Sequence, residues 1–341
     1  MATTTPSDFV IYTDWVQSGY IEKLAQNVNG FNMNSNYAIN LTTSMLVGNY
    51  KERAFFEELA QADLINDRDK NSTSAVTPAE MKQLEDVIPY IPSRFGPYET
   101  TRSAFLDIGK SPEEFSALLG GALADAVMKD MLDTSFSALI SAIQDTDAMT
   151  VGAGAAGTAA LSYDSMIDGM AVFGDRLDNI ACFVMRAKDY YGLMKGNVTA
   201  ATIDSVAGAT LTEGSVATLG KPVLVMDSPS LVATGLAADD SGAVLALTEN
   251  AITCIADDDF FLTTDTVLGK DNITIMWQGE SQYGVDLKGY VYDKTVGTGA
   301  SGMKGAAAVT GSKSFLATAT GGINTASATI LKGFRILSTV W

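Results

Sequence analysis

Histidine is absent from the 341-residue sequence, and cysteine occurs only twice, at Cys182 and Cys254. Without histidine, a Ser-His-Asp triad, a Cys-His pair and an HExxH zinc site are excluded, and two distant cysteines form neither a CxxC motif nor a disulfide framework. Both cysteines stand in apolar runs, so we expect two small buried hydrophobes. We predict no catalytic, cofactor-binding or metal-binding residues, and hence no enzyme.

Basic residues are also scarce, because 22 Lys and Arg face 40 Asp and Glu, which gives a net charge of −18. An acidic surface of this kind does not grip a phosphate backbone tightly. No run of about 18 apolar residues is present to span a membrane, and the N-terminus lacks the basic and apolar regions of a secretory signal. With 47% apolar residues, we expect a globular protein made in a reducing cytoplasm and not bound to a membrane.

One motif points toward an enzyme. The stretch "VGAGAAG" places Gly152, Gly154 and Gly157 in the GxGxxG spacing of a dinucleotide-binding turn, and Asp175 follows near the position of a ribose-binding acid. That turn requires a buried strand before the glycines, whereas an amphipathic segment and the polar "QDTDAMT" precede them here. We therefore predict a flexible hinge, and a nucleotide-dependent oxidoreductase stays a remote alternative.

Clustered carboxylates are the other possible site. Asp257 to Asp259, or the pair Asp239 and Asp240, could start a site for a hard cation. Neither cluster has the spaced ligands and glycine of a calcium loop, so we expect solvated turns.

Residues 1 to 50 are rich in Thr, Ser, Asn and aromatic residues. Leaving Phe9, Tyr12, Trp15 and Tyr20 in water is costly, which favours an arm that docks on the surface of a neighbouring subunit.

The next segment combines apolar residues with three prolines. Glu52 to Ile65 has its apolar residues near one helical face, and a polar, turn-rich stretch follows. Beyond it, Pro89, Pro92 and Pro97 exclude a helix interior and a central strand. We predict an extended, two-stranded excursion with exposed edges, in which Tyr90, Phe95 and Tyr98 contact another subunit.

A long helix is predicted from Ser111 to Gln144. Ser111 is the expected N-cap, Pro112 the first helical residue, and Glu114 completes a capping box. Apolar residues then recur with a period of 3.6, over a length of about 50 Å if the helix is continuous. Gly120 and Gly121 make a kink in this spine helix conceivable, since each costs about 1 kcal/mol relative to alanine.

Apolar runs and helical segments alternate over residues 160 to 260, which indicates a compact α/β subdomain. Residues 272 to 293 are predicted to form strands with a turn at Gly279, and the chain ends in an apolar, strand-like segment.

Three stretches carry a resemblance to a known family when they are taken in this order of elements. They are the "DYYGL" helix within Ala187 to Leu193, "LGKPVLV" from Leu219 to Val225, and "GVDLKGY" from Gly284 to Tyr290. With the arm, excursion and spine helix, they resemble the major capsid proteins of tailed bacteriophages with the Hong Kong 97-like fold.

The resemblance implies an α+β, Hong Kong 97-like fold in five parts. These are an N-terminal arm (1–50), an extended loop and its base (51–110), the spine helix of a peripheral domain (111–150), an axial domain (151–260), and peripheral strands with a C-terminal segment (261–341).

The resemblance also implies function and partners. The protein would be a major capsid protein of the virion, made in the host cytoplasm, whose hexamers and pentamers close into an icosahedral shell around double-stranded DNA without sequence-specific binding. Scaffolding, portal and decoration proteins are the expected partners, and because the sequence starts at the arm we expect a separate scaffold or none. An encapsulin-like nanocompartment shell remains the alternative with the same fold.

Overall fold

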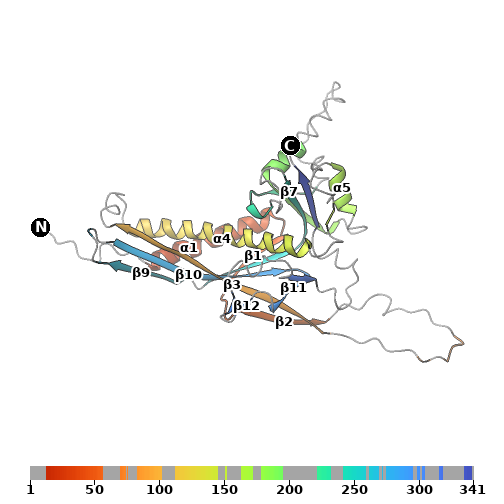
Figure 1. The fold of residues 1–341 in the computed structure, drawn as a ribbon, viewed down its shortest axis with the longest axis horizontal. Helices are drawn as coiled ribbons and strands as arrows, with labels where there is room; N and C mark the ends of the chain where they lie inside the picture. Colours follow the sequence, from red (N-terminus) through yellow and green to blue (C-terminus); the bar gives the residue numbers. More distant parts are fainter. Residues whose placement is uncertain are drawn as a thin grey trace, which may run out of the picture.

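The computed structural model describes residues 13–56, 70–73, 75, 83–101, 112–144, 150–151, 163–171, 178–194, 221–231, 241–258, 261–268, 271, 274–294, 298–299, 302–303, 315–317 and 334–339. Helices and strands both contribute, which confirms the α+β class. Figure 1 shows an elongated molecule in which a long helix lies along one sheet, and a second, smaller sheet stands near the C-terminal end of that helix.

The long helix α4 (Pro112–Gln144) confirms the predicted spine. It begins at the proline that the capping signal marks as the first helical residue, and it runs without a break through Gly120 and Gly121 for 33 residues. Its second half is almost completely enclosed, since Met131, Phe136 and Ile143 are fully buried. The spine is therefore the element around which the core is built.

Helix α1 (Thr13–Asn34) packs along the first half of α4. Its buried side chains recur every fourth residue, at Val16, Tyr20, Leu24 and Val28. Gly19 lies against Ala117, and the side-chain amide of Asn27 donates to the Asp125 carboxylate at 2.6 Å, so the two helices run in the same direction.

Two glycines let these helices approach closely. A Cβ atom on Gly120 would lie 2.2 Å from the carbonyl oxygen of Val16, and one on Gly19 would lie 2.8 Å from the carbonyl oxygen of Ala117. Backbone atoms cannot swing aside as side-chain ends can. Gly120 therefore stands in the middle of a helix because any side chain there would push α1 away.

The position of α1 differs from our expectation for residues 1–50. We expected an arm that relies on a neighbour's surface, but residues 13–34 are covered by the chain's own spine helix. Strand β1 (Ile39–Ser44) then enters the chain's own first sheet beside β8 (Ile252–Asp257). The physical reason is that the stripe of apolar residues on α1 fits the stripe on α4 with both glycines at the contact.

The first sheet has the strand order β1-β8-β10-β3-β2, and β9 pairs with the free edge of β10. The additional bounds are β10 (Thr274–Leu287), β3 (Gln83–Thr101), β2 (Tyr50–Phe56) and β9 (Phe261–Val267). The pairing of β1 with β8 is parallel, and all the others are antiparallel. The Tyr283 hydroxyl of β10 reaches Thr134 at 2.9 Å and Asp130 at 3.0 Å, which joins this sheet to α4.

Strand β3 changes its partner halfway along its length. Gln83 to Pro89 pair with β2, whereas Tyr90 to Thr101 pair with β10. The ladder with β2 ends at Pro89 and the ladder with β10 begins at Tyr90, so each proline has one edge on which no amide donor is needed. The prediction of an extended, two-stranded excursion holds for residues 83–89, which pair with β2, but not for residues 90–101, which belong to the chain's own first sheet. We call β2 together with residues 83–89 of β3 the ribbon.

The helical expectation for Glu52 to Ile65 is wrong for its first residues, because they belong to β2, and residues 57–65 lie outside the described ranges. Phe55 and Phe56 pair with Leu84 and Gln83 across the ribbon. Pairing with a distant segment here outweighs a local helical period.

The turn expected at Gly279 is also wrong, because β10 continues through this residue as one strand of 14 residues. Its ladder with β3 shifts register between Trp277 and Gly279, opposite Gly96, which has a φ of 78°. A Cβ atom on Gly279 would lie 3.2 Å from side-chain atoms of Phe95 and Leu262. The glycine therefore provides space for neighbouring side chains within the sheet.

The second sheet confirms the predicted α/β alternation. Its order is β4-β15-β7-β5-β6, with β4 (Thr150–Val151), β15 (Phe334–Thr339), β7 (Ser241–Thr248), β5 (Ile180–Met185) and β6 (Val223–Val225). Helix α5 (Tyr163–Ala171), a helix over 187–194 and the 3-10 turn η5 (Pro229–Leu231) accompany it.

Both faces of β5 are buried. Phe183 and Met185 pack with Met166 of α5 and Leu193, while Cys182 and Val184 join the core that contains α4. This two-sided burial explains why the sequence of β5 is an unbroken apolar run.

The remaining strands form two small pairs. Strand β11 (Tyr290–Tyr292) pairs with β14 (Phe315–Ala317), and β12 (Thr298–Gly299) pairs with β13 (Gly302–Met303).

The glycine contact between the helices predicts a contrast between neighbouring residues. Gly120→Ala should lower the free energy of unfolding of the dissociated subunit by about 2 kcal/mol or more, because the new methyl group overlaps backbone. Gly121→Ala is the matched control. No atom lies within 4 Å of its Cβ position, so it should raise the free energy of unfolding by up to about 1 kcal/mol. Urea unfolding measures both, and equal stability of the two variants would contradict the close helix contact.

Candidate functional site

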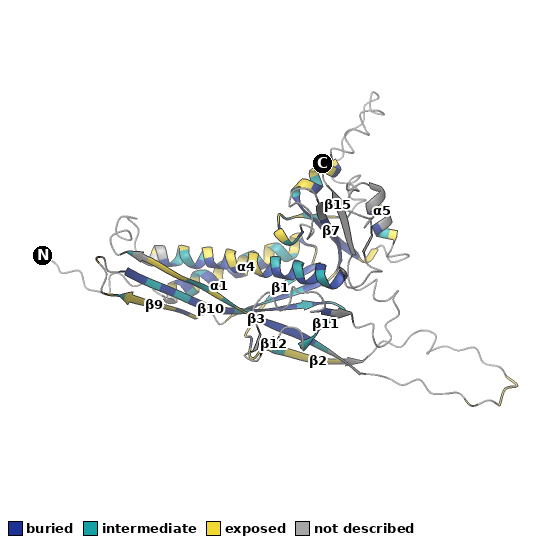
Figure 2. Ribbon diagram, in the orientation of Figure 1, coloured by how far each residue is buried: buried dark blue, intermediate teal, exposed yellow. Residues whose placement is uncertain are grey.

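The described residues offer two features for function, exposed apolar side chains and a charged pocket. Figure 2 shows exposed positions along the outer faces of α1 and α4 and on strands β2, β3 and β9. Large apolar side chains are exposed on these elements, among them Trp15, Leu118, Tyr98 and Phe261, and in the loop after β1 at Met45 and Val47. Exposed apolar groups of this size favour contact with another protein surface.

The predicted contact residues divide into four groups. Trp15 and Tyr98 are each 54% exposed, so both have surface to offer a neighbour, although Tyr98 also stacks on Trp277 with ring centroids 4.6 Å apart. Phe95 is half-buried against the core. Phe9 and Tyr12 lie outside the described residues.

Tyr20 and Tyr90 are buried within their own subunit. Tyr20 lies between α4 and the first sheet, and burial raises its pKa to about 12. Tyr90 packs with Leu46 and Ile88 at the start of the ribbon. Both rings therefore contribute mainly to the fold of the chain itself.

The predicted hinge residues Gly152, Gly154 and Gly157 lie outside the described residues. The two residues before them form β4, which pairs in parallel with β15. The glycine segment thus begins where the chain passes from the spine helix into the second sheet.

The expected solvated turn at Asp257 is wrong, because this carboxylate is buried at the end of β8. Its Oδ1 atom accepts a hydrogen bond from the backbone amide of Leu46 at 3.2 Å. Asp257 thus fixes the loop after β1. Asp239, Asp240 and Asp259 lie outside the described residues, and within the described ranges no group of three or more potential ligand side chains is placed to hold a metal ion.

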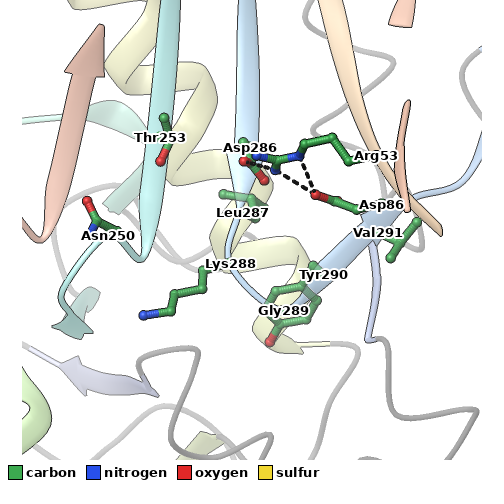
Figure 3. A pocket seen from close by; sticks show the side chains of 10 residues that line it. All are labelled: Arg53, Asp86, Asn250, Thr253, Asp286, Leu287, Lys288, Gly289, Tyr290 and Val291. Carbon is green, nitrogen blue, oxygen red and sulfur yellow. Dashed lines mark hydrogen bonds and ion pairs between the residues drawn. The ribbon is translucent and has the colours of Figure 1, made fainter. Parts of the chain in front are cut away.

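The charged pocket lies at the base of the ribbon and has a volume of about 270 Å³. Arg53 of β2 is its central residue (Figure 3). The Nε and Nη2 atoms of Arg53 donate to Asp86 of β3 at 3.0 and 2.6 Å, and Nη2 also donates to Asp286 of β10 at 2.5 Å. Lys288 lines the same pocket and donates from Nζ to the carbonyl oxygen of Glu249 at 2.9 Å.

One guanidinium is thus shared by two carboxylates, and the pKa values reflect this. Burial raises the pKa of Asp286, and the attraction of Arg53 offsets only part of that effect. Burial alone would lower the pKa of Arg53, but Asp286 and Asp86 together raise it. The arrangement joins three strands electrostatically, with Arg53 ionised throughout the physiological range.

Sequence reasoning missed this cluster. The three side chains are separated by 33 and 233 positions along the chain. The stretch "YKERAF" has three charged residues in a row and no period-2 alternation, so no local signal suggested a strand carrying Arg53.

Comparison with known proteins gives one family and several distant structures. The model of the Gp13-like family, described as "Major capsid protein 13-like", matches residues 8–311. No curated protein matches the chain significantly.

Solved structures similar to this chain include that of Microbacterium phage Oxtober96, at 10% identity over 74% of this chain and 84% of that one, with a TM-score of 0.47. The Cyanophage Pam1 capsid asymmetric unit matches over the same shares at 7% identity and a TM-score of 0.47. The capsid of a native GTA particle matches at 16% identity over 72% and 84%, with a TM-score of 0.43. The family match over most of the chain is the stronger finding.

The two cysteines provide a test of the core. Both are free and fully buried, and burial raises the pKa of each thiol to about 12. In the folded protein at pH 8, neither thiol should react with a disulfide reagent, whereas both should react in denaturant. Ala54→Cys places a thiol on the exposed part of β2 as a positive control. A native thiol that reacts as fast as this control would contradict the described core.

Proposed function

Belonging to the Gp13-like family of major capsid proteins, the chain is a shell-forming capsid protein of the virion, and we propose that its shell is built from hexamers and pentamers around double-stranded DNA. The family indicates a structural role, in keeping with the absence of histidine from the sequence. Among the described residues, no helix has both the length and the apolarity needed to cross a bilayer.

The observation that carries this proposal is the contrast between a closed body and an exposed ribbon. The body has a continuous core from α1 through α4 to both sheets. In the ribbon, Val87 and Ile88 of β3 are buried, whereas the β2 residues Lys51 to Ala54 are all exposed. A two-stranded ribbon is at best marginally stable in water on its own, so a neighbouring subunit that covers it would add stability.

The five-part division of a Hong Kong 97-like subunit is the proposed framework for these contacts. The ribbon is then the base of the extended loop within 51–110, and α4 with the first sheet forms the peripheral domain. The second sheet belongs to the axial domain, proposed within 151–260, although its strand β15 comes from residues 334–339 and β8, inside that range, belongs to the first sheet. The arm is proposed within 1–50, of which α1 and β1 pack on the chain's own body. Overlapping loops multiply weak contacts through high effective concentration.

The segment of residues 145–160, in which β4 precedes Gly152, Gly154 and Gly157, is proposed as a joint between the spine helix and the α/β unit. One sequence must fit both pentamers and hexamers, and glycine tolerates the widest range of backbone angles. Backbones of residues 145–160 that superpose in every position of the shell would contradict this joint.

The acidic chain is proposed to line the container without binding its DNA tightly. A net charge of −18 repels phosphate at long range, so the DNA stays free to enter and leave. Synthesis in the host cytoplasm and contacts with scaffolding, portal and decoration proteins complete the proposal. An inner wall found to be strongly basic would count against the electrostatic part.

The shell predicts megadalton particles. Purified chain, alone or with a scaffold from its own source, should give rings or closed shells in sedimentation and electron microscopy. A chain that stays a monomer or dimer under every assembly condition would contradict the proposal.

Trp15 is the predicted contact residue with exposed surface on a helix. Trp15→Ser should lower the free energy of unfolding of the isolated subunit by up to about 2 kcal/mol, because nearly half of the indole is covered within the subunit. Covering the exposed half of the indole buries roughly 100 Å², worth about 2 kcal/mol per contact, so the concentration needed for assembly should rise at least about tenfold. Light scattering against protein concentration measures this effect. Asn29→Ser, at another exposed position of α1, is the control, and equal assembly of both variants would remove Trp15 from the interface.

A further inference from the structure

The ribbon leaves the first sheet where β3 changes its partner, between Pro89 and Tyr90, and we call this point the fork. Gly284 is the last residue of β10 that pairs with β3, opposite Tyr90, and the residues after it pair with β8 instead. On the other branch, Pro89 pairs with Tyr50 of β2. The two ladders meet at Tyr90, which pairs with Gly284 and whose amide also donates to the carbonyl oxygen of Asn49 at 3.0 Å. Val87 and Ile88 anchor the β3 side of the ribbon in the core. Beyond Tyr90, β2 has no ladder with β10, so side chains must fix the angle of its far part.

Arg53 spans this fork. Asp86, its directly opposite neighbour in the ribbon, accepts its hydrogen bonds on one side. Asp286 lies on the other branch, beyond the last pair of β3 with β10, and accepts from the same Nη2 atom. As Figure 3 shows, one guanidinium therefore makes one contact within the ribbon and one across the fork.

The opposite face of the ribbon is held separately. Tyr50 stacks on Tyr292 of β11 with ring centroids 6.0 Å apart, and Glu52 pairs with Lys294 at 2.5 Å. Residues 50 and 52 point to one side of β2 and residues 51 and 53 to the other. The Glu52 pair is largely exposed, and exposed pairs stabilise little and are screened by salt. The partly buried contact with Asp286 is thus the firmer of the two ionic restraints on the ribbon.

We propose that Arg53 is a positioning residue whose contact with Asp286 sets the angle at which the ribbon leaves the body, while its contact with Asp86 only joins the two ribbon strands. The inference about the angle rests on the fold alone. Its consequence is that the Arg53–Asp286 contact, which we call the clamp, directs the extended loop toward a neighbouring subunit, and this consequence rests on the proposed function.

Two matched substitutions distinguish the positioning contact with Asp286 from the contact with Asp86. Asp286→Asn and Asp86→Asn each remove one negative charge from the same guanidinium, and the two side chains have nearly equal exposure, 16% and 15%. A general loss of charge or stability would affect both variants alike. A loss of positioning would appear only in Asp286→Asn.

The readout is a distance distribution between two spin labels in the full-length chain. Ala54→Cys labels the exposed part of the ribbon and Ala126→Cys labels an exposed position of α4, while the two native thiols are buried. Labelled chain is diluted into excess unlabelled chain, so that only distances within one subunit contribute. Thermal unfolding of each variant verifies that the body remains folded.

In the parent chain and in Asp86→Asn we expect one narrow distribution at the same distance. A tilt of about 15° displaces a residue four positions along the strand by about 3 Å, at roughly 3.3 Å per residue. Asp286→Asn should therefore shift or broaden the distribution by at least that amount, and Asp286→Glu should restore it. High salt should move the parent chain toward the Asp286→Asn distribution and leave that variant unchanged.

Two outcomes would overturn the clamp. Either Asp286→Asn matches the parent chain, or Asp86→Asn shifts as far as Asp286→Asn does. The measurement does not depend on assembly, so a chain that shows the expected shift but forms no shell would contradict the proposed function alone.

Discussion

The contact of α1 with α4 at Gly19 and Gly120 is the constraint on which the rest of the fold depends. It brings the stripe of Val16, Tyr20, Leu24 and Val28 against the spine helix, and it fixes where the chain emerges from α1. From there β1 reaches β8, which in turn pairs with β10. Because β10 contacts α4 through Tyr283, the packing of the helices and the position of the first sheet stabilise each other. Glycine destabilises the interior of a helix, but at position 120 it permits the two helices to pack closely.

The partner change of β3 divides the molecule into a body with its own core and a ribbon, of which the β3 strand is partly buried and the β2 residues Lys51 to Ala54 are exposed. Prolines are compatible with both halves because each half of the strand is paired on one side. A subunit of a closed shell gains from this division. Its body can fold before assembly, and its weakly supported segments become stable when neighbours cover them, so that assembly and the ordering of those segments are coupled. The Arg53 cluster stands at the boundary and connects the two parts.

Local signals in the sequence predicted the elements that depend on local chemistry. The start of α4 followed from Pro112 within a capping pattern, and β5 followed from an unbroken apolar run. Helix α1 was missed because Asn, Gln and Ser surround its buried stripe and other apolar residues, such as Ile21 and Met33, lie outside that stripe. Its partner stripe also lies about a hundred positions away. β2 was missed because Phe55 and Phe56 suit a helical face as well as a strand. The Arg53 cluster joins residues 233 positions apart, and no local pattern encodes such a meeting. Trp15 and Tyr98 were predicted as contact residues because exposing a large aromatic side chain to water is unfavourable. Both are exposed in the subunit, so contact with a neighbour stays a prediction.

Hydrogen exchange measured on the free subunit and on the assembled particle tests the central claim, that a self-sufficient body carries a ribbon which neighbours stabilise. The account predicts that amides of α1 and α4 are protected in both states, and that amides of β2 and residues 83–89 exchange rapidly in the free subunit and slowly in the particle. Strong protection of the ribbon in the free subunit, or protection of α1 that arises only on assembly, would contradict it.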